Sequence, residues 1–359
     1  LFCIIMAIKV AVLDDYHGLA PSYFGKLDPL VFTVKYFPET LRPYNNATTS
    51  EEERRELIKR LEPFEVISTL RERTPFPREL IEQLPRLKLI LSCGRRNKAI
   101  DMEACQSRGI PVTATIDKHV GLVDSTTEHI VTLILAACRS IPYHDTAIKT
   151  GKWQTRLVTS ISGKTLGLVG LGRLGGAVAR IMSLAFGTKI VAWSTNLTQE
   201  VADEQARAQG LPVQNQDGEK TFKAVSREEL FSTADVVSVQ LVLSDRTRGL
   251  ITESDLSKMK PFSFFINTSR GPLVVEKDLL SVLEAGKIRG AALDVFDLEP
   301  LPLDSKWRNS DWGTNGKSQL VVTPHIAFVE ERAMNEFYEQ QVAELLRWSS
   351  GQTLSKTMD

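Results

Sequence analysis

The sequence is poor in cysteine, and the few cysteines that it has are scattered. Four occur in 359 residues, with no Cys-x-x-Cys pair and no histidine at a metal-ligand spacing. Thiols distributed in this way are typical of reduced cysteines in a cytosolic protein. The pattern argues against a disulfide framework and against a zinc site, so we expect no metal. The four are Cys3, Cys93, Cys105 and Cys138.

The sequence also lacks an excess of charge of either sign. It contains 44 basic and 44 acidic residues, which gives a formal net charge of +0. A protein that binds nucleic acid or an anionic membrane surface needs a basic excess or a basic stripe. The balanced composition therefore argues against both kinds of partner.

Long hydrophobic runs are missing as well. No stretch reaches the roughly 20 apolar residues that a membrane-spanning helix needs. The first six residues are apolar but carry no basic region and no small-residue cleavage site, so we expect no signal peptide and a cytoplasmic protein. Because the chain begins with Leu1, we interpret Met6 as the natural start and residues 1–5 as an extension.

Two series of alternating strand and helix patterns are present, and they indicate two domains. A chain of 359 residues is too long for one small core. Short apolar runs separated by amphipathic stretches predict parallel sheets flanked by helices. The first series has predicted strands at 8–13, 31–37, 66–70, 87–91 and 111–115. The second series has them at 165–170, 189–193, 234–241, 262–267, 290–294 and 320–323.

The second series predicts a doubly wound, dinucleotide-binding fold, since six strands with intervening helices make two βαβαβ halves. Residues 303–319 form a long irregular loop, and loops of that length are usually functional or disordered. A long amphipathic helix over 330–348 then returns the chain to the first domain. We therefore expect a substrate domain over 1–118 plus 330–359 and a dinucleotide-binding domain over 119–329.

One predicted helix between the two series is unusually apolar. It covers 125–139, and from residue 130 to residue 138 it is apolar almost all round. Such a helix must be buried on several sides. A domain junction or a subunit interface would bury it, and an ordinary internal helix explains the pattern equally well.

A glycine-rich turn follows the first strand of the second series. Residues 170–175 read Gly-Leu-Gly-Arg-Leu-Gly, after an apolar strand and before a helix with one apolar face. There the first two glycines allow a tight turn and the approach of a pyrophosphate, and the third lets the helix pack on the strand. The helix N-terminus favours the negative charge. We therefore predict a bound dinucleotide that contacts Gly170, Gly172, Arg173, Leu174 and Gly175.

The end of the next strand is expected to contact the ribose of that dinucleotide. It reads Ser194-Thr195-Asn196, without the Asp or Glu that usually binds the 2′-hydroxyl of NAD. Small hydroxyl and amide groups can surround a 2′-phosphate instead, although Arg173 is the one cation nearby in the sequence. These three residues are predicted cofactor contacts, and they favour NADP(H) by a small margin while leaving NAD(H) open.

Three charged or titratable groups follow three other predicted strands. Arg270 follows the strand at 262–267, Glu299 follows the one at 290–294, and His325 follows the one at 320–323. Taken singly, each is more simply a surface side chain in a loop. In open α/β sheets, however, ligands bind beyond the carboxyl ends of the strands, where the three would share one rim with the nucleotide.

Together the three groups suit hydride transfer to a 2-oxo acid. His325 is the natural general acid, because histidine titrates near neutrality. A carboxylate beside the imidazole favours its protonated form and orients the ring, which assigns Glu299. A guanidinium holds the substrate carboxylate and polarises the 2-oxo group, which assigns Arg270. The other histidines lack this setting and are interpreted as structural: His17, His119, His129 and His144.

With these motifs the chain resembles the D-isomer-specific 2-hydroxyacid dehydrogenase family, which includes glyoxylate/hydroxypyruvate reductases and 3-phosphoglycerate dehydrogenases. The resemblance covers nearly the whole chain. It implies a Rossmann nucleotide-binding domain, a flavodoxin-like substrate domain and NAD(P)-dependent interconversion of a 2-oxo acid and a D-2-hydroxy acid. The motifs are Gly-Leu-Gly-Arg-Leu-Gly at 170–175, Asn-Thr-Ser-Arg-Gly at 267–271, Leu-Asp-Val-Phe at 293–296 and Thr-Pro-His-Ile at 323–326.

The resemblance also implies a substrate loop in the first domain. Residues Gly94, Arg95, Arg96 and Asn97 are similar to the family's substrate-carboxylate loop, whose backbone amides bind the acid. Many relatives have a small or apolar residue where this chain has Arg95. The extra cation fits an acidic or polar substrate and, equally well, a surface salt bridge.

On the cofactor side, the resemblance implies that Asp294 and the Thr268 carbonyl contact the nicotinamide carboxamide. Members of the family often have His and Pro where this chain has residues 240–243, so the contacts on the adenosine side, with Leu241 among them, depart from the usual pattern. Homodimerisation through the nucleotide-binding domain is also implied, and the apolar helix at 130–138 is consistent with it.

Two other classes of protein share this architecture. Formate dehydrogenases do, but Glu299 and the sequence Thr323-Pro324-His325 argue against them. A non-catalytic, nucleotide-sensing corepressor can keep the same three catalytic residues, although it should carry partner-binding extensions that the sequence does not contain. The chain ends soon after the helix that follows His325, so we expect no regulatory domain of the kind found in some phosphoglycerate dehydrogenases.

Overall fold

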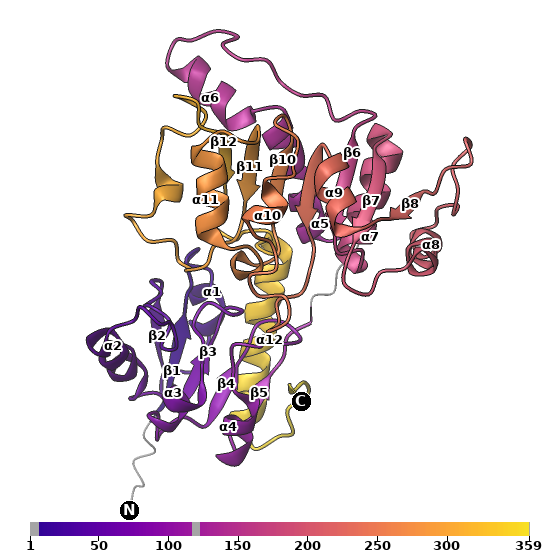
Figure 1. Cartoon of the computed structure of the whole chain (residues 1–359). Coiled ribbons are helices and arrows are strands. Elements are labelled where there is room, and N and C mark those ends of the chain that lie inside the picture. The colour runs from indigo at the N-terminus through magenta and orange to yellow at the C-terminus, as the bar shows by residue number, and fades with distance from the viewer. Residues whose placement is uncertain (1–6, 117–122, 359) are drawn as a thin grey trace, which may run out of the picture. The chain divides into compact units, whose positions relative to one another are not determined.

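The chain forms two compact units, Leu1–Val120 with Val329–Asp359 and Gly121–Phe328. The structure is a computed structural model, and it describes residues 7–116 and 123–358. Both units are parallel sheets flanked by helices (Figure 1), so the predicted fold class is confirmed. No helix within the described ranges is long and apolar enough to cross a membrane. The proposed extension at 1–5, the expected boundary at 118–119 and His119 lie outside the described residues.

The first unit is a five-stranded sheet with short helices and one long C-terminal helix. Its strands are β1 (Ile8–Leu13), β2 (Phe32–Phe37), β3 (Val66–Ser68), β4 (Leu89–Leu91) and β5 (Val112–Thr113). Its helices are α1 (Pro21–Phe24), α2 (Glu51–Leu61), α3 (Arg78–Glu82), α4 (Met102–Ser107) and α12 (Glu331–Ser349). All strand pairs are parallel, in the order β2-β1-β3-β4-β5, which is the flavodoxin-like order.

Helix α12 closes the first unit, as the amphipathic pattern at 330–348 predicts. Its Gln341 side chain is fully buried and lies at the carboxyl ends of β3 and β4. The amide Nε2 donates to the Leu91 carbonyl at 2.9 Å and to the Thr69 carbonyl at 3.3 Å, and Oε1 accepts a 2.8 Å bond from the Ser68 hydroxyl. The helix thereby holds the end of β3 and the end of β4, and the predicted substrate loop follows β4.

The second unit is a seven-stranded sheet. Its strands are β6 (Thr165–Val169), β7 (Lys189–Trp193), β8 (Phe222–Ala224), β9 (Val236–Val239), β10 (Phe264–Asn267), β11 (Gly290–Leu293) and β12 (Gln319–Val322). Its helices are α5 (Ser125–Cys138), α6 (Ile141–Lys149), α7 (Arg173–Phe186), α8 (Gln199–Ala208), α9 (Arg227–Thr233), α10 (Glu253–Leu256) and α11 (Glu276–Glu284).

The strand order of the second unit is that of a doubly wound sheet. All pairs are parallel, in the order β12-β11-β10-β9-β6-β7-β8, and the order reverses at β6. The sequence predicted six of these strands and missed β8. That strand has three residues, lies at the sheet edge and contains the exposed Lys223, so it gives no apolar pattern. Edge strands are commonly short and charged.

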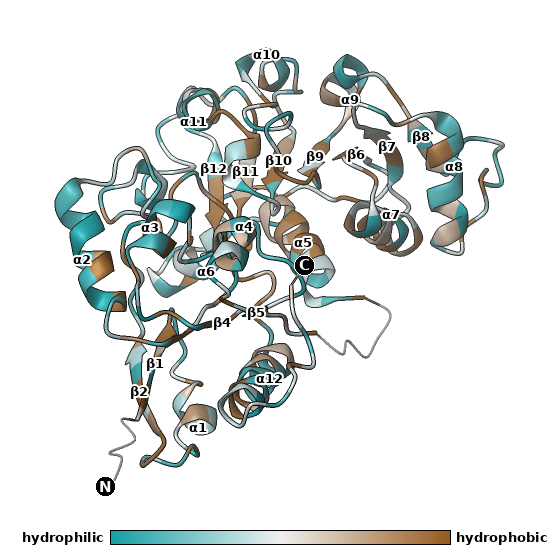
Figure 2. Ribbon diagram, turned by 90° about the horizontal axis from the view of Figure 1, so that it is seen from below, coloured by the Kyte–Doolittle hydropathy of each residue, from teal (hydrophilic) through white to brown (hydrophobic). Residues whose placement is uncertain are grey.

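Helices cover both faces of the second sheet. Leu168 points into one apolar cluster, with residues of α5, α7 and α8, whereas the next residue, Val169, points into the other, with residues of α9, α10 and α11. In Figure 2 the strands of both sheets are mostly brown and surface helices such as α2 are mostly teal. The α5 residues Ile130 and Ile134 are fully buried in the first cluster, so one face of the apolar helix is covered by its own unit. With both faces covered, the strand ends are the places where a ligand can reach the sheet.

Candidate active site

The glycine-rich turn follows β6, and its backbone requires two of the glycines. Gly170 has φ +108, which L residues rarely adopt, and a Cβ there would lie 2.8 Å from the Gln240 carbonyl oxygen. A Cβ on Gly175 would collide with the Gly170 carbonyl. Leu174 is partly buried against the cluster on one face of the sheet and Leu241 against the cluster on the other. The turn is therefore held tightly between two neighbouring strand ends.

The turn also fits a bound nucleotide diphosphate. Gly172 is the N-cap of the 14-residue helix α7, has no side-chain capping bond, and would place a Cβ in open space with nothing within 4 Å. The first amides of a helix are donors that suit a phosphate. Within the described residues, two buried atoms at this sheet edge, Gln240 Oε1 and Thr268 Oγ1, have no hydrogen-bond partner. The open space at Gly172 and the first amides of α7 are what a dinucleotide diphosphate would need here.

The end of β7 lies beside the same turn. The Gly170 amide donates a 2.9 Å hydrogen bond to the Trp193 carbonyl, which joins the two strand ends. Beyond Trp193, Ser194 is half-buried and Thr195 and Asn196 are exposed. The three predicted ribose contacts are thus next to the glycine turn, and none of them carries a carboxylate.

Two arginines lie near this part of the sheet, and both are paired with carboxylates. Arg173 forms an ion pair with Asp124, the N-cap of α5. Arg227, which was not singled out from the sequence, lies 5.3 Å from the centre of the Trp193 ring and holds Asp255 through two hydrogen bonds of 2.7 Å. A 2′-phosphate would therefore compete with a carboxylate for either guanidinium.

Glu299 and His325 are in direct contact. Glu299 Oε2 lies 2.6 Å from His325 Nδ1, and Oε1 accepts a 2.9 Å hydrogen bond from the Phe296 amide. The two side chains are 20% and 16% exposed. A carboxylate held at both oxygens orients the imidazole and favours a hydrogen on Nδ1. Proton exchange with a substrate would then use Nε2.

The backbone at His325 adopts a conformation that side chains seldom adopt. Its φ is +52, and its amide donates a 3.0 Å hydrogen bond to the Thr323 carbonyl. Left-handed residues other than glycine persist only where their surroundings hold them, and they cluster at active sites. Asp294 holds the following residues, because its carboxylate accepts from the amides of Ile326 at 2.9 Å and Ala327 at 3.1 Å.

Asp294 is fully buried and directly follows β11. Besides the two amides, it accepts a 2.6 Å hydrogen bond from the Thr323 hydroxyl. Burial acts to raise the pKa of Asp294, but hydrogen bonds from His129, Thr323 and Ile326 outweigh it and hold that pKa below its ordinary value. The carboxylate is therefore an internal anchor. Its expected contact with a nicotinamide carboxamide has no counterpart among these partners and stays a prediction.

Arg270 follows β10, the strand next to β11, and is half-buried. A Cβ on the next residue, Gly271, would overlap the Phe296 carbonyl, so the loop after β10 packs directly on the segment that leads to Glu299. The three predicted catalytic residues thus follow adjacent strands at one edge of one sheet. Glu299 and His325 are in direct contact, and the packing of Gly271 on Phe296 brings the loop that carries Arg270 to the same edge.

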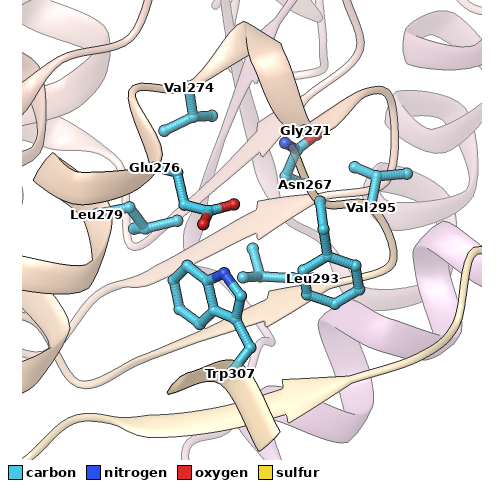
Figure 3. A pocket seen from close by; sticks show the side chains of 9 residues that line it. Asn267, Gly271, Val274, Glu276, Leu279, Leu293, Val295 and Trp307 are labelled. Carbon is cyan, nitrogen blue, oxygen red and sulfur yellow. The ribbon is translucent and has the colours of Figure 1, made fainter. Parts of the chain in front are cut away.

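A small cavity lies behind this packing (Figure 3). Its volume of about 10 Å³ suits one water molecule, so it is not a substrate or cofactor site. The carboxylate of Glu276 and the indole of Trp307 line it. Trp307 is 2% exposed and stacks on Trp312, with ring centres 6.0 Å apart. The long loop over 303–319, expected to be functional or disordered, is therefore anchored in the core by its tryptophans.

The predicted substrate loop of the first unit follows β4. The Gly94 amide donates a 2.7 Å hydrogen bond to the Thr115 hydroxyl, so it is occupied within the unit. Asn97 is buried, and its side chain donates at 2.7 Å to a backbone carbonyl of the loop after β3. Arg95 and Arg96 are exposed, and no hydrogen bond in the described part of the chain uses their amides. Of the backbone amides in this loop, those of Arg95 and Arg96 are therefore better suited than that of Gly94 to bind the carboxylate of an acid.

Two residues at these strand ends were missed from the sequence. Gln240 directly follows β9 and lies beneath the glycine turn, and Thr323 directly follows β12 and bonds Asp294. Each is the first polar residue after a buried or partly buried strand. Both lie inside the strands predicted at 234–241 and 320–323, which end later than β9 and β12 do, so neither was expected at a strand end.

Residues 131–327 match the family model described as D-isomer specific 2-hydroxyacid dehydrogenase, NAD binding domain. The hydroxypyruvate reductase of Blautia hydrogenotrophica is 27% identical over 311 residues, which cover 84% of this chain and 88% of that protein. The D-3-phosphoglycerate dehydrogenase of Archaeoglobus fulgidus is 34% identical over 276 residues, 76% of this chain and 47% of that protein. The chain therefore spans about half the length of that dehydrogenase.

Among solved structures, the chain is similar to the phosphoglycerate oxidoreductase of Vibrio cholerae O395. The sequence identity is 31% and the TM-score is 0.76, with 96% of this chain and 99% of that chain covered. The glycine turn, Arg270, Glu299 and His325 all lie within the segment that the family model matches. The likeness thus includes the edge of the sheet described above.

Gly172→Ala is expected to leave the stability of the fold unchanged, because the added methyl group meets nothing within 4 Å. It is expected to weaken binding of NADPH at least about tenfold, because the methyl group occupies the space through which the backbone approaches a pyrophosphate. Gly175→Ala is expected instead to lower Tm by several degrees, since its Cβ collides with Gly170. Scanning fluorimetry and titration calorimetry measure the two effects. Wild-type nucleotide affinity in Gly172→Ala would contradict the placement of the phosphates.

Proposed function

The chain belongs to the D-isomer specific 2-hydroxyacid dehydrogenase family, and we propose that Arg270, Glu299 and His325 carry its reaction, the interconversion of a 2-oxo acid and a D-2-hydroxy acid. The observation that supports these roles is the 2.6 Å contact between Glu299 and His325, at the sheet edge that also bears the glycine turn. A non-catalytic, nucleotide-sensing protein is not favoured, because the named relatives are reductases and dehydrogenases.

His325 is the proposed proton donor. A bound nicotinamide would supply the hydride for C2 of the 2-oxo acid. The negative charge that develops on the C2 oxygen then takes a proton from His325 Nε2, because Nδ1 is engaged with Glu299. The Glu299 carboxylate stabilises the protonated ring before this transfer. In the oxidative direction the same nitrogen accepts the proton of the C2 hydroxyl.

Arg270 is the proposed binder of the substrate carboxylate. A guanidinium forms two parallel hydrogen bonds to a carboxylate and, from the same position, polarises the neighbouring 2-oxo group. Its place after β10, next to the segment that carries Glu299, supports this role. In the first unit, the amides of Arg95 and Arg96 remain our proposed donors to an acidic group.

NADP(H) is the cofactor that we propose, by a small margin over NAD(H). The end of β7 offers the hydroxyl groups of Ser194 and Thr195 and the amide of Asn196 where an NAD-specific site would have a carboxylate. The pairing of Arg173 with Asp124 reduces the cationic support for a 2′-phosphate, which keeps the margin small.

A homodimer formed through α6 and the segment after it is also proposed. Most apolar side chains of α5 pack in the core of the second unit. Exposed apolar side chains lie instead on residues 141–158, which follow α5 in the same unit. Trp153 is 75% exposed and Leu157 is 87% exposed, and a hollow of about 590 Å³ lies between them and α6. A second copy of the chain would cover such a patch. The other exposed apolar residues there are Ile141, Ile148 and Val158.

A reducing, cytoplasmic location is the last part of the proposal. Cys93, Cys105 and Cys138 are buried and form no disulfide among the described residues. Burial raises the pKa of the Cys93 thiol to about 12, so that thiol stays protonated and unreactive.

His325→Ala is expected to lower kcat at least about a thousandfold while the Kd for NADPH stays within twofold of wild type, because the imidazole acts on the substrate and not on the nucleotide. The assay follows nucleotide oxidation with glyoxylate, hydroxypyruvate, phenylpyruvate and 2-oxo-isocaproate, and fluorescence titration gives the Kd. No turnover of any of these acids by the wild type would argue against the reaction. Equal loss of turnover and of nucleotide affinity would argue against the role of His325.

Thr195→Asp is expected to reverse the cofactor preference. A carboxylate there would repel a 2′-phosphate and accept from a 2′-hydroxyl, so kcat/KM with NADPH should fall at least about tenfold and kcat/KM with NADH should rise. Thr198→Asp is the control, because it adds the same charge three residues later at the N-cap of α8, where Asp also caps. A wild-type preference for NADH, or equal effects of the two variants, would overturn the assignment.

Leu157→Glu is expected to convert the dimer into a monomer, because a buried, unpaired carboxylate destabilises an apolar interface. Leu303→Glu is the matched control, since Leu303 is 91% exposed and lies outside the patch. Light scattering coupled to size-exclusion chromatography gives the masses. A monomeric wild type, or a Leu157→Glu protein that stays dimeric, would count against this interface.

A further inference from the structure

His129 contacts the residues that flank the proposed catalytic histidine. It lies on α5, a helix that packs against β10, β11 and β12, and its side chain is 15% exposed. Its Nε2 is 3.2 Å from the Thr323 hydroxyl oxygen and 3.3 Å from Asp294 Oδ1. None of these three residues has an assigned part in proton transfer, yet all three lie directly behind the His325 loop.

The position of the Thr323 hydroxyl proton decides whether His129 Nε2 donates or accepts in its contact with Thr323. The Thr323 hydroxyl is 2.6 Å from Asp294 Oδ1, and an ionised carboxylate accepts only, so Thr323 donates its proton there. Its oxygen is then an acceptor towards His129. The hydrogen between them must therefore be on His129 Nε2, which donates to Thr323 and also lies within reach of Asp294.

The network includes residues that precede His325 in the sequence and residues that follow it. Two residues before it, the Thr323 hydroxyl bonds Asp294, and after it the amides of Ile326 and Ala327 bond the same carboxylate at 2.9 and 3.1 Å. His325 itself has φ +52, a conformation that needs support from its surroundings. A change in the place of Asp294 would thus move both ends of the turn that carries the imidazole.

We propose that His129 is a positioning residue for His325: by donating from Nε2 to Thr323 and Asp294, it fixes the turn on which the imidazole meets Glu299. The inference rests on the proposed function, in which that imidazole transfers the proton. It would give His129 a role beyond the structural one expected from the sequence. A catalytic group that is misplaced by about 1 Å loses about a hundredfold in rate, so a contact of this kind affects kcat.

Three substitutions of His129 separate a hydrogen bond from packing. Glutamine places its amide nitrogen about where Nε2 lies, asparagine carries the same amide but is too short to reach, and leucine fills the space without a donor. Thr132→Leu is the control, because Thr132 is exposed on the same helix. For each variant we would measure kcat, both KM values and the Kd for NADPH with the 2-oxo acid on which the wild type is fastest.

The expected result is a loss in kcat without a loss in binding. His129→Leu and His129→Asn should lower kcat by about 10- to 100-fold with both KM values and the nucleotide Kd within twofold, whereas His129→Gln should stay within about threefold of wild type. A kcat for His129→Asn within twofold of wild type, or a His129→Gln as slow as His129→Asn, would overturn the proposal. If His129→Leu does not fold, the Gln and Asn pair decides the question.

A second readout does not depend on turnover. In protein labelled with [¹⁵N]histidine, the His325 ring signals are identified by their loss in His325→Ala. They should shift in His129→Asn and stay unchanged in Thr132→Leu. Unchanged His325 signals in His129→Asn would overturn the positioning role even if the wild type turns over rapidly. Absence of turnover in the wild type would instead refute the proposed function, and the ring signals would still test the contact.

Discussion

The hydrogen bond between Glu299 Oε2 and His325 Nδ1 is the interaction on which the site depends. It joins the loops that follow β11 and β12, and it sets which imidazole nitrogen is available to a substrate. Neighbouring hydrogen bonds hold its two partners in place. The Phe296 amide bonds the other oxygen of Glu299, and Asp294 bonds the backbone that follows His325. Because both partners are mostly buried, loss of either one would leave a polar group without compensation.

The fold explains why this interaction lies beside a nucleotide site. In an all-parallel sheet every strand ends at the same edge, and the order reverses at β6, where the glycine turn follows. Helices cover both faces of the sheet, so polar side chains gather at the strand ends. The glycines bring backbone close to backbone: Gly170 meets Gln240, and Gly271 meets Phe296. The neighbouring strand ends are thereby kept in register.

Much of this arrangement could be predicted from the sequence, because it depends on local patterns. Apolar runs and the glycine turn predicted the two parallel sheets, and the position of polar residues after strands predicted the contact between Glu299 and His325. The strand β8 was missed since three residues at an edge carry no pattern.

Other features could not be predicted, because they depend on packing between distant segments. His129 and Thr323 are 194 residues apart in the chain and meet because α5 lies on the sheet. The pairing of Arg173 with Asp124 is of the same kind, and it weakens the argument that Arg173 serves a phosphate. The apolar pattern of α5 fitted an interface and an internal helix equally, and the sequence could not show which of its residues pack in the core of the second unit. A crystal structure with NADP⁺ and the unreactive 2-oxo acid analogue oxamate tests the central claim most directly. We predict that His325 Nε2 lies within about 3.2 Å of the analogue's carbonyl oxygen while Nδ1 keeps its bond to Glu299. An imidazole that points away from the analogue, or that is separated from Glu299, would contradict it.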